Sequence, residues 1–98
     1  MYGTVAHMKV KPGKIDEFIA FSKEFADQRR PKGYVGEYIY QLDSNPNEIM
    51  MVVLIQDKQS YQANASDPAM DKEYRRYREL LEADPHWHDG EIIFSFPS

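Results

Sequence analysis

The sequence predicts an α+β domain of the ferredoxin-like type, in which an antiparallel sheet carries its helices on one face. Three observations predict this fold class. Stretches rich in β-forming side chains open the chain, form a pair in its middle and close it. Two stretches with apolar residues at helical spacing separate them, and Pro-Gly, Asn-Pro and Asp-Pro dipeptides stand near the junctions. The resulting order is β-α-β-β-α-β, and a length of 98 residues favours one domain over residues 1–98.

The first strand and the first helix are predicted from their different periods. Residues 2–10 alternate between two faces of mixed character, with His7 on the face opposite Ala6. Apolar residues then recur at helical spacing over residues 15–26, which predicts one broad apolar stripe. Pro31 is expected to end this helix, since proline cannot continue the backbone hydrogen-bond ladder.

A β-hairpin is predicted in the middle of the chain. Residues 35–42 are rich in valine, isoleucine and tyrosine, and residues 48–56 read EIMMVVLIQ. Residues 43–47, with the sequence DSNPN, are dense in turn formers and are expected to connect the two strands.

A short helix over residues 57–64 and a longer one beginning at Asp67-Pro68 are expected next. Aspartate is a favoured N-cap residue, and proline is favoured at the first helical position. Asp84-Pro85 is expected to end the longer helix, and residues 91–96 alternate as a last strand. The apolar stripe of the longer helix consists of Met70, Tyr74, Tyr77 and Leu81.

The strand EIMMVVLIQ is apolar on both of its sides. An antiparallel strand with one wet face alternates apolar with polar residues, so both faces of this strand are expected to be covered. Two helices cover only one face, and a second copy of the chain is the simplest cover for the other. An exposed apolar patch on a monomer is the alternative. The predicted homodimer interface consists of Val5, His7, Met50, Val52 and Leu54.

Composition narrows the class of protein. The net charge of −4 gives no bulk attraction to nucleic acid or anionic membranes, and the strand EIMMVVLIQ lacks the aromatics of an RNA-binding ferredoxin-like sheet. The absence of cysteine excludes disulfides and thiolate metal sites. The N-terminal residues do not have the pattern of a signal peptide, and no apolar run is long enough for a membrane span. A cytoplasmic protein with neither nucleic acid nor membrane as a partner is therefore expected.

Four segments carry a resemblance to a known family. They read KVKPGKIDEF (9–18), GYVGEYIYQ (33–41), QDKQSYQANASDPAM (56–70) and EADPHWHDGE (82–91). With their order and spacing, the sequence resembles the antibiotic biosynthesis monooxygenase-like proteins of the dimeric α/β-barrel superfamily. The resemblance implies a dimer whose two sheets pack face to face, and a small ligand between the helices and the sheet of each protomer. It also implies an activity among cofactor-free oxygenases of quinols and aromatic polyketides, or among haem-degrading enzymes.

The haem-degrading pattern is not kept in this sequence. Those relatives use an asparagine, a tryptophan and a histidine where this chain has Ala6, Ile55 and Tyr74. Tyr74 is the one residue left as a haem ligand, since tyrosinate binds haem iron in other proteins. Haem binding through Tyr74 is therefore the weaker alternative to an oxygenase that needs no cofactor.

A ligand pocket between the helices and the sheet is expected from the residues that share the face of Ala6 and Ile55. Oxygenase chemistry needs a base or hydrogen-bond donors there to stabilise a deprotonated aromatic. A packed core is the alternative interpretation of the same residues. The predicted pocket residues are Met8, Phe18, Met51, Val53, Ile55, Tyr74, Tyr77 and Trp87.

The segment PHWHDGE (85–91) contains His86 and His88, whose spacing would place both side chains on one side of an extended chain. A zinc site needs three or four protein ligands, which this segment does not supply, so no metal is expected. Trp87 is expected to anchor the segment, with Asp89-Gly90 as a turn before the last strand.

The leading hypothesis is a homodimeric, cofactor-independent monooxygenase of a small aromatic or quinol-like compound. Its candidate catalytic residues are Tyr74, His86 and His88. The alternative is a non-catalytic module of the same fold that binds a small aromatic or apolar ligand.

Overall fold

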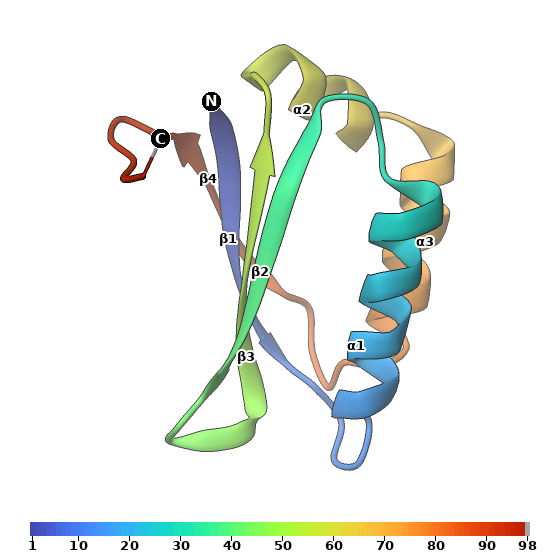
Figure 1. The fold of residues 1–98 in the computed structure, drawn as a ribbon. Coiled ribbons are helices and arrows are strands. Elements are labelled where there is room, and N and C mark those ends of the chain that lie inside the picture. Colours follow the sequence, from blue (N-terminus) through green and yellow to red (C-terminus); the bar gives the residue numbers. More distant parts are fainter. Residues whose placement is uncertain (98) are drawn as a thin grey trace.

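The computed structural model describes residues 1–97 and contains a four-stranded antiparallel sheet with three α-helices on one face (Figure 1). The strands are β1 (Tyr2–Lys9), β2 (Tyr34–Leu42), β3 (Asn45–Ile55) and β4 (His86–Glu91). Their order across the sheet is β2-β3-β1-β4. The helices are α1 (Ile15–Glu24), α2 (Lys58–Ala65) and α3 (Pro68–Arg78), and α1 continues into the π-helical turn η1 (Phe25–Arg29). The predicted ferredoxin-like α+β fold is therefore confirmed.

Two aspartates begin the second and third helices. The Asp57 side chain accepts a hydrogen bond of 2.7 Å from the backbone N–H of Ser60 at the start of α2. The Asp67 side chain accepts one of 2.9 Å from the N–H of Ala69, and Pro68 takes the first position of α3. Side chains that accept from the first free N–H groups stabilise a helix start by about 1 kcal/mol.

The core lies between the sheet and the pair α1 and α3. Phe18, on α1, is fully buried, and its ring centroid lies 5.1 Å from that of Tyr77 on α3. Tyr77 also meets the Phe21 ring at 4.5 Å, edge to face, and its hydroxyl donates to the buried Ser22 Oγ at 3.0 Å. This aromatic cluster fixes the distance between the two helices and the sheet. Val10, Ile49 and Leu81 complete the most deeply buried set.

The two faces of the sheet differ in what covers them. The side chains of Thr4, Ala6 and Met8 are buried on the helix side, together with those of Met51 and Ile55. No helix of residues 1–97 lies over the other face (Figure 1). No helix within residues 1–97 is long and apolar enough to cross a membrane.

The predicted last strand, residues 91–96, was wrong: β4 is His86–Glu91, and residues 92–96 are not part of it. Trp87 pairs in register with Ala6, and Asp89 with Thr4, so Asp89-Gly90 is part of the strand and makes no turn. All six residues of β4 are exposed in the single chain. Apolar alternation therefore could not locate this strand, whose place depends on backbone pairing with β1.

The long helix also ends earlier than expected, at Arg78 instead of Asp84. After it, the chain pairs with the segment that follows β1. The N–H of Lys11 donates to the Leu80 carbonyl at 2.8 Å, and the N–H of Glu82 donates to the Lys9 carbonyl at 2.9 Å. These bonds replace the helical ladder. They place Leu81 in the core.

The hairpin connection is shorter than expected, because β3 begins at Asn45 inside the predicted loop 43–47. Gly33, before β2, has a positive φ of 84°, and a Cβ there would lie 2.9 Å from the Ser60 Cβ. Only glycine therefore allows this turn to sit against α2.

Candidate functional site

A cavity of about 470 Å³ lies between the helix-facing side of the sheet and the helical layer. Its floor consists of side chains from all four strands, and its walls come from η1, α2 and α3. This volume lies in the range of small-molecule sites, and the wall is mostly apolar and aromatic, as is usual for such sites. The lining residues are Thr4, Met8, Phe25, Pro31, Tyr34, Glu37, Met51, Val53, Ile55, Tyr61, Asn64, Ala65, Met70, Asp71, Glu73, Tyr74, Tyr77, Trp87 and Asp89.

Most of the residues that the sequence predicts for a pocket line this cavity. They are Met8, Met51, Val53, Ile55, Tyr74, Tyr77 and Trp87. The Tyr74 and Trp87 rings face each other with centroids 6.3 Å apart. Phe18 does not line the cavity, because it is 0% exposed behind the Tyr77 ring and belongs to the packed core.

The candidate catalytic residues are divided between the two faces of the sheet. Tyr74 lines the cavity, but His86 and His88 do not. They pair in register with His7 and Val5, and they alternate with Trp87 and Asp89, which do line it. His86 and His88 therefore stand on the uncovered face of the sheet. Within residues 1–97 no three histidine, aspartate or glutamate side chains are grouped so that they could hold a metal ion.

Sequence reasoning missed Glu37, a half-buried acid of the cavity. Glu37 stands in the middle of the β-forming run YVGEYIYQL of β2, on the side that faces the helices. The Tyr34 hydroxyl donates to its Oε1 at 2.9 Å. Burial raises the pKa of Glu37, and the hydrogen bond from Tyr34 opposes that rise. An acid at a core-facing position of an otherwise apolar strand is the signal that would have found it.

A second acid and tyrosine pair lies at the opposite edge of the sheet. The Tyr61 hydroxyl, from α2, donates to Asp89 Oδ1 on β4 at 2.8 Å. Burial and the neighbouring Asp89 carboxylate raise the pKa of Tyr61 to about 12. Burial, as the largest cause, also raises the pKa of Tyr77 to about 12. Both phenols therefore stay protonated at neutral pH and act as hydrogen-bond donors, not as bases.

The two acids belong to one row across the strands. Glu37 pairs with Val53, Val53 pairs with Thr4, and Thr4 pairs with Asp89. Thr4 is 3% exposed, and its Oγ1 makes no hydrogen bond of full geometry among the described residues, although it interacts with the Tyr61 hydroxyl. The floor of the cavity thus has an acid at each end of the row and a buried hydroxyl between them.

Glu73 is a further polar group of the wall. Its side chain is 13% exposed, and its Oε1 lies 2.7 Å from the Nε of Arg29 in η1. Arg29 also donates to Glu24 Oε1 at 2.7 Å, which lowers the pKa of Glu24. The π-helical turn brings Arg29 to α3, so this ion pair depends on tertiary packing that a helical pattern does not reveal.

Four acids line the cavity: Glu37, Asp71, Glu73 and Asp89. None of the lining residues in the described chain is a lysine, an arginine or a histidine. The predicted pocket residues are all apolar or aromatic, so the sequence did not reveal the acidic character of this cavity. An acidic, aromatic cavity without basic side chains disfavours anionic ligands.

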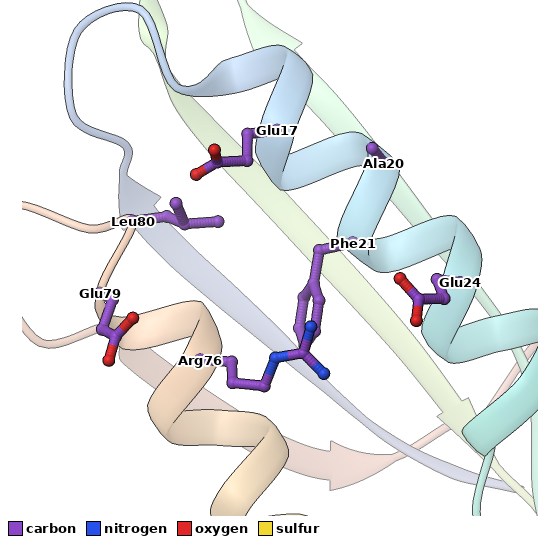
Figure 2. A pocket seen from close by; sticks show the side chains of 7 residues that line it. All are labelled: Glu17, Ala20, Phe21, Glu24, Arg76, Glu79 and Leu80. Carbon is purple, nitrogen blue, oxygen red and sulfur yellow. The ribbon is translucent and has the colours of Figure 1, made fainter.

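A second hollow, of about 340 Å³, lies on the outer side of α1 and α3 and has a different character (Figure 2). The guanidinium of Arg76 stands over the Phe21 ring, 4.3 Å from its centroid. Glu17, Glu24 and Glu79 surround it and are exposed to solvent. The hollow is a solvated surface groove that its own arginine occupies in part, and it does not reach the sheet.

The predicted interface residues occupy the uncovered face. Val5 pairs with Val52, and His7 pairs with Met50, while Gly3 pairs with Leu54. On β2 the neighbouring Tyr38 and Tyr40 are 68% and 53% exposed. His7 Nε2 lies within hydrogen-bond distance, 2.8 Å, of Glu48 Oε1. The uncovered face is thus apolar and aromatic over β1, β2 and β3.

Comparison with known protein families identifies the family of this chain. The family model for antibiotic biosynthesis monooxygenases matches residues 1–80. The chain belongs to the antibiotic biosynthesis monooxygenase family. None of the curated proteins matches the sequence.

Several solved structures share the fold of this chain, although their sequence identity to it is low. SnoaB, a cofactor-independent oxygenase from Streptomyces nogalater solved as a mutant, is 14% identical with a TM-score of 0.80. The match covers 99% of this chain and 97% of SnoaB. A conserved protein from Methanosarcina mazei Go1 is 21% identical with a TM-score of 0.76, over 91% of this chain and 89% of the other. At these identities the likeness concerns the fold alone.

Proposed function

We propose that this protein is a cofactor-independent monooxygenase that oxidises a small aromatic or quinol-like compound in the cavity between sheet and helices. Family membership and the fold shared with SnoaB, an oxygenase of this kind, support the proposal. The observation that carries it is the cavity of about 470 Å³, whose aromatic walls surround a half-buried acid, Glu37. An electron-rich ring stacks on such walls, and a buried acid receives the proton of its hydroxyl group.

The chemistry needs only the substrate and dioxygen. An aromatic hydroxyl that loses its proton leaves an electron-rich anion, which reduces dioxygen. A ring carbon that carries two hydrogens in the keto tautomer becomes a carbonyl: two C–H bonds break and one C=O bond forms. The second oxygen atom leaves as water with the two hydrogens. Because all four electrons come from the substrate, no further reductant is required.

The cavity does not fit haem well. Of its lining residues, the sequence suggested only Tyr74 as an iron ligand. The described lining contains no basic side chain that could pair with the two propionate groups of haem. Four acidic side chains surround the space instead. These residues favour an uncharged aromatic ligand over haem.

Oxygen uptake tests the proposed activity. A panel of quinols and hydroxylated fused-ring aromatics is supplied to the chelator-treated protein in an oxygen electrode. At least one member is expected to be consumed with dioxygen. Thermal stabilisation by panel members without any oxygen uptake would instead support the alternative, a non-catalytic ligand-binding module.

A pair of variants on α2 ties the activity to the cavity. Ala65 is exposed and lines the cavity, so Ala65→Trp is expected to obstruct entry and to lower oxygen uptake at least about ten-fold. Ala63 is exposed on the same helix but does not line the cavity, so Ala63→Trp is the matched control. Equal uptake by the two variants would place the reaction elsewhere.

We also propose that two copies pack through their uncovered sheet faces. Val5, His7, Met50, Val52 and Leu54 would form the centre of this interface. The exposed apolar residues Ile93, Phe94 and Phe96, which are 95%, 82% and 88% exposed, follow β4 and supply further surface for a second copy. Contiguous apolar surface of this kind is rare on monomers.

A further inference from the structure

We propose that the ligand is an uncharged hydroxyaromatic compound whose hydroxyl hydrogen is received by the carboxylate of Glu37, and that the cavity rejects anions of the same size. This inference rests on the proposed function only in taking the cavity as the ligand site. It identifies a binding group and a ligand class that its own binding experiment tests.

The cavity has more hydrogen-bond acceptors than donors. Glu37 Oε1 accepts from Tyr34, and this is the one hydrogen bond to the Glu37 carboxylate among the described residues. Glu73 Oε2 is also buried without a hydrogen-bond partner, but Nε and Nη2 of Arg29, its ion-pair partner, are unpaired as well, so donors of the chain itself lie beside Glu73. Buried polar groups in native proteins are nearly always paired, so the remaining acceptor capacity of Glu37 indicates a ligand that brings a donor. Hydroxyl groups on an aromatic ring are donors that suit an apolar, aromatic wall.

Thr4 is a further polar group that a ligand in the cavity would meet. Its hydroxyl lies in the middle of the floor, is almost completely buried, and makes no hydrogen bond of full geometry within residues 1–97, although its interaction with the Tyr61 hydroxyl opposes the rise in the pKa of Tyr61. An unsatisfied buried hydroxyl costs free energy unless something in the cavity pairs with it. A hydroxyaromatic ligand supplies that partner, since a ligand hydroxyl both donates and accepts.

Among the four acids of the cavity, Glu37 is the one best placed to receive a proton. Glu73 is held by Arg29, and Asp71 by Arg75, whose Nη2 lies 2.9 Å from Asp71 Oδ2. Asp89 is exposed and already accepts from Tyr61. Glu37 is half-buried and has no ion-pair partner among the described residues, so its charge gains most from a donor.

The row of residues across the floor indicates the shape of the ligand. Glu37 and Asp89 stand on the two edge strands, three strand spacings apart, which is roughly 14 Å between their Cα atoms. Val53 and Thr4 lie between them. An elongated fused-ring compound with a polar group near each end would lie along this row, with its ring over Val53 and one hydroxyl on Glu37.

Among the described residues, Tyr34 on the same strand and Tyr77 on α3 interact directly with Glu37. Glu73, Arg29 and Arg30 are charged groups near these two tyrosines, and Tyr61 and Asp89 line the cavity across from Glu37. When the ligand is oxidised, its O–H bond breaks, the proton moves to Glu37, and the electron pair stays on the ligand oxygen. Burial raises the pKa of Glu37, which brings its proton affinity closer to that of a phenol.

The test compares four probes of similar size that need not react. They are para-nitrophenol, its methyl ether para-nitroanisole, the anion para-nitrobenzoate, and the cation phenyltrimethylammonium. Calorimetry at a pH below the ionisation of para-nitrophenol is expected to rank this phenol at least about ten-fold tighter than the ether, since hydrogen bonds to charged groups are strong. Para-nitrobenzoate is expected to bind weakest of the four.

The variant Glu37→Gln keeps the size of the side chain and an acceptor for Tyr34. It is expected to reduce the preference for the phenol over the ether to within about three-fold and to improve binding of para-nitrobenzoate. Glu17→Gln, an exposed acid on α1 outside the cavity, is the control and is expected to bind like the wild type.

Three results would overturn the inference: an unchanged preference for the phenol in Glu37→Gln, wild-type binding of para-nitrobenzoate as tight as that of the phenol, or tightest binding of phenyltrimethylammonium. The last would indicate a cationic ligand held by aromatic and acidic side chains. Failure of the proposed function is a separate outcome. In that case the probes bind as expected, but no aromatic compound is oxidised by dioxygen.

Discussion

Truncation of Phe18 tests the division between packed core and open cavity. Phe18 is 0% exposed, and its ring lies against that of Tyr77. Removal of a buried phenylalanine side chain costs about 3–5 kcal/mol, because the transfer free energy is lost and a cavity remains. In a domain of this size each kcal/mol lowers the Tm by about 4–8 °C, so Phe18→Ala is expected to lower it by at least about 12 °C.

Tyr74 provides the comparison for Phe18. Its side chain is half-buried and lines the cavity against Trp87, so Tyr74→Ala removes contacts from a space that is already open. It is expected to cost less than half as much free energy of unfolding as Phe18→Ala. Conversely, Tyr74→Ala is expected to weaken binding of para-nitrophenol, since it removes a wall on which the ring stacks.

Urea unfolding at two protein concentrations measures both variants, because a dimer makes the apparent stability concentration-dependent. If Phe18→Ala leaves too little folded protein, Phe18→Leu is expected to show a smaller loss in the same direction. A cost below about 1 kcal/mol for Phe18→Ala would mean that Phe18 borders open space, and the reasoning about the core would be refuted.

Three further predictions follow from the same structure. Burial raises the pKa of Glu37 above its ordinary value, so between the ordinary and the raised pKa the folded state binds more protons than the unfolded state. The free energy of unfolding of the wild type therefore falls as pH rises through this range. Glu37→Gln is therefore expected to gain free energy of unfolding relative to the wild type as pH rises from the ordinary pKa of a glutamate towards the raised pKa of Glu37, and a constant difference in urea titrations would contradict the linkage. Tyr77→Phe is expected to cost about 1 kcal/mol, because it leaves the buried Ser22 hydroxyl without its partner, and an unchanged urea midpoint would argue against that bond. Val52→Asp places a charge in the middle of the uncovered face and is expected to convert the dimer to a monomer in sedimentation velocity, whereas a wild-type protein that is itself monomeric at micromolar concentration would refute the interface.

The fold could be predicted because its signals are local. The helical stripes, the turn residues and the alternation of β1 and β3 each report on burial within a single element. The same alternation placed Met8, Met51, Val53 and Ile55 on one face of the sheet, where they line the cavity. β4 was misplaced because an edge strand with exposed side chains has no apolar signature, and its pairing with β1 is made by backbone groups.

The polar part of the site could not be predicted, because its pairs are distant in the sequence. Tyr61 and Asp89 are 28 residues apart, and Glu73 meets Arg29 only through the π-helical turn of η1. Glu37 is different, since an acid at a helix-facing position of β2 is visible in the sequence. Its importance depends on knowing that β2 borders a cavity and not a filled core. The choice between those two interpretations depends on packing, which periodicity does not report.

Oxidation under heavy-isotope dioxygen tests the central claim most directly. The panel member that drives the fastest oxygen uptake is incubated with the chelator-treated protein and labelled dioxygen, and the product is analysed by mass spectrometry. A monooxygenase that uses dioxygen without a cofactor is expected to place one labelled oxygen atom in the product, and Ala65→Trp is expected to suppress that product. An unlabelled product, or labelled product formed equally by Ala65→Trp, would contradict the assignment of the reaction to this cavity.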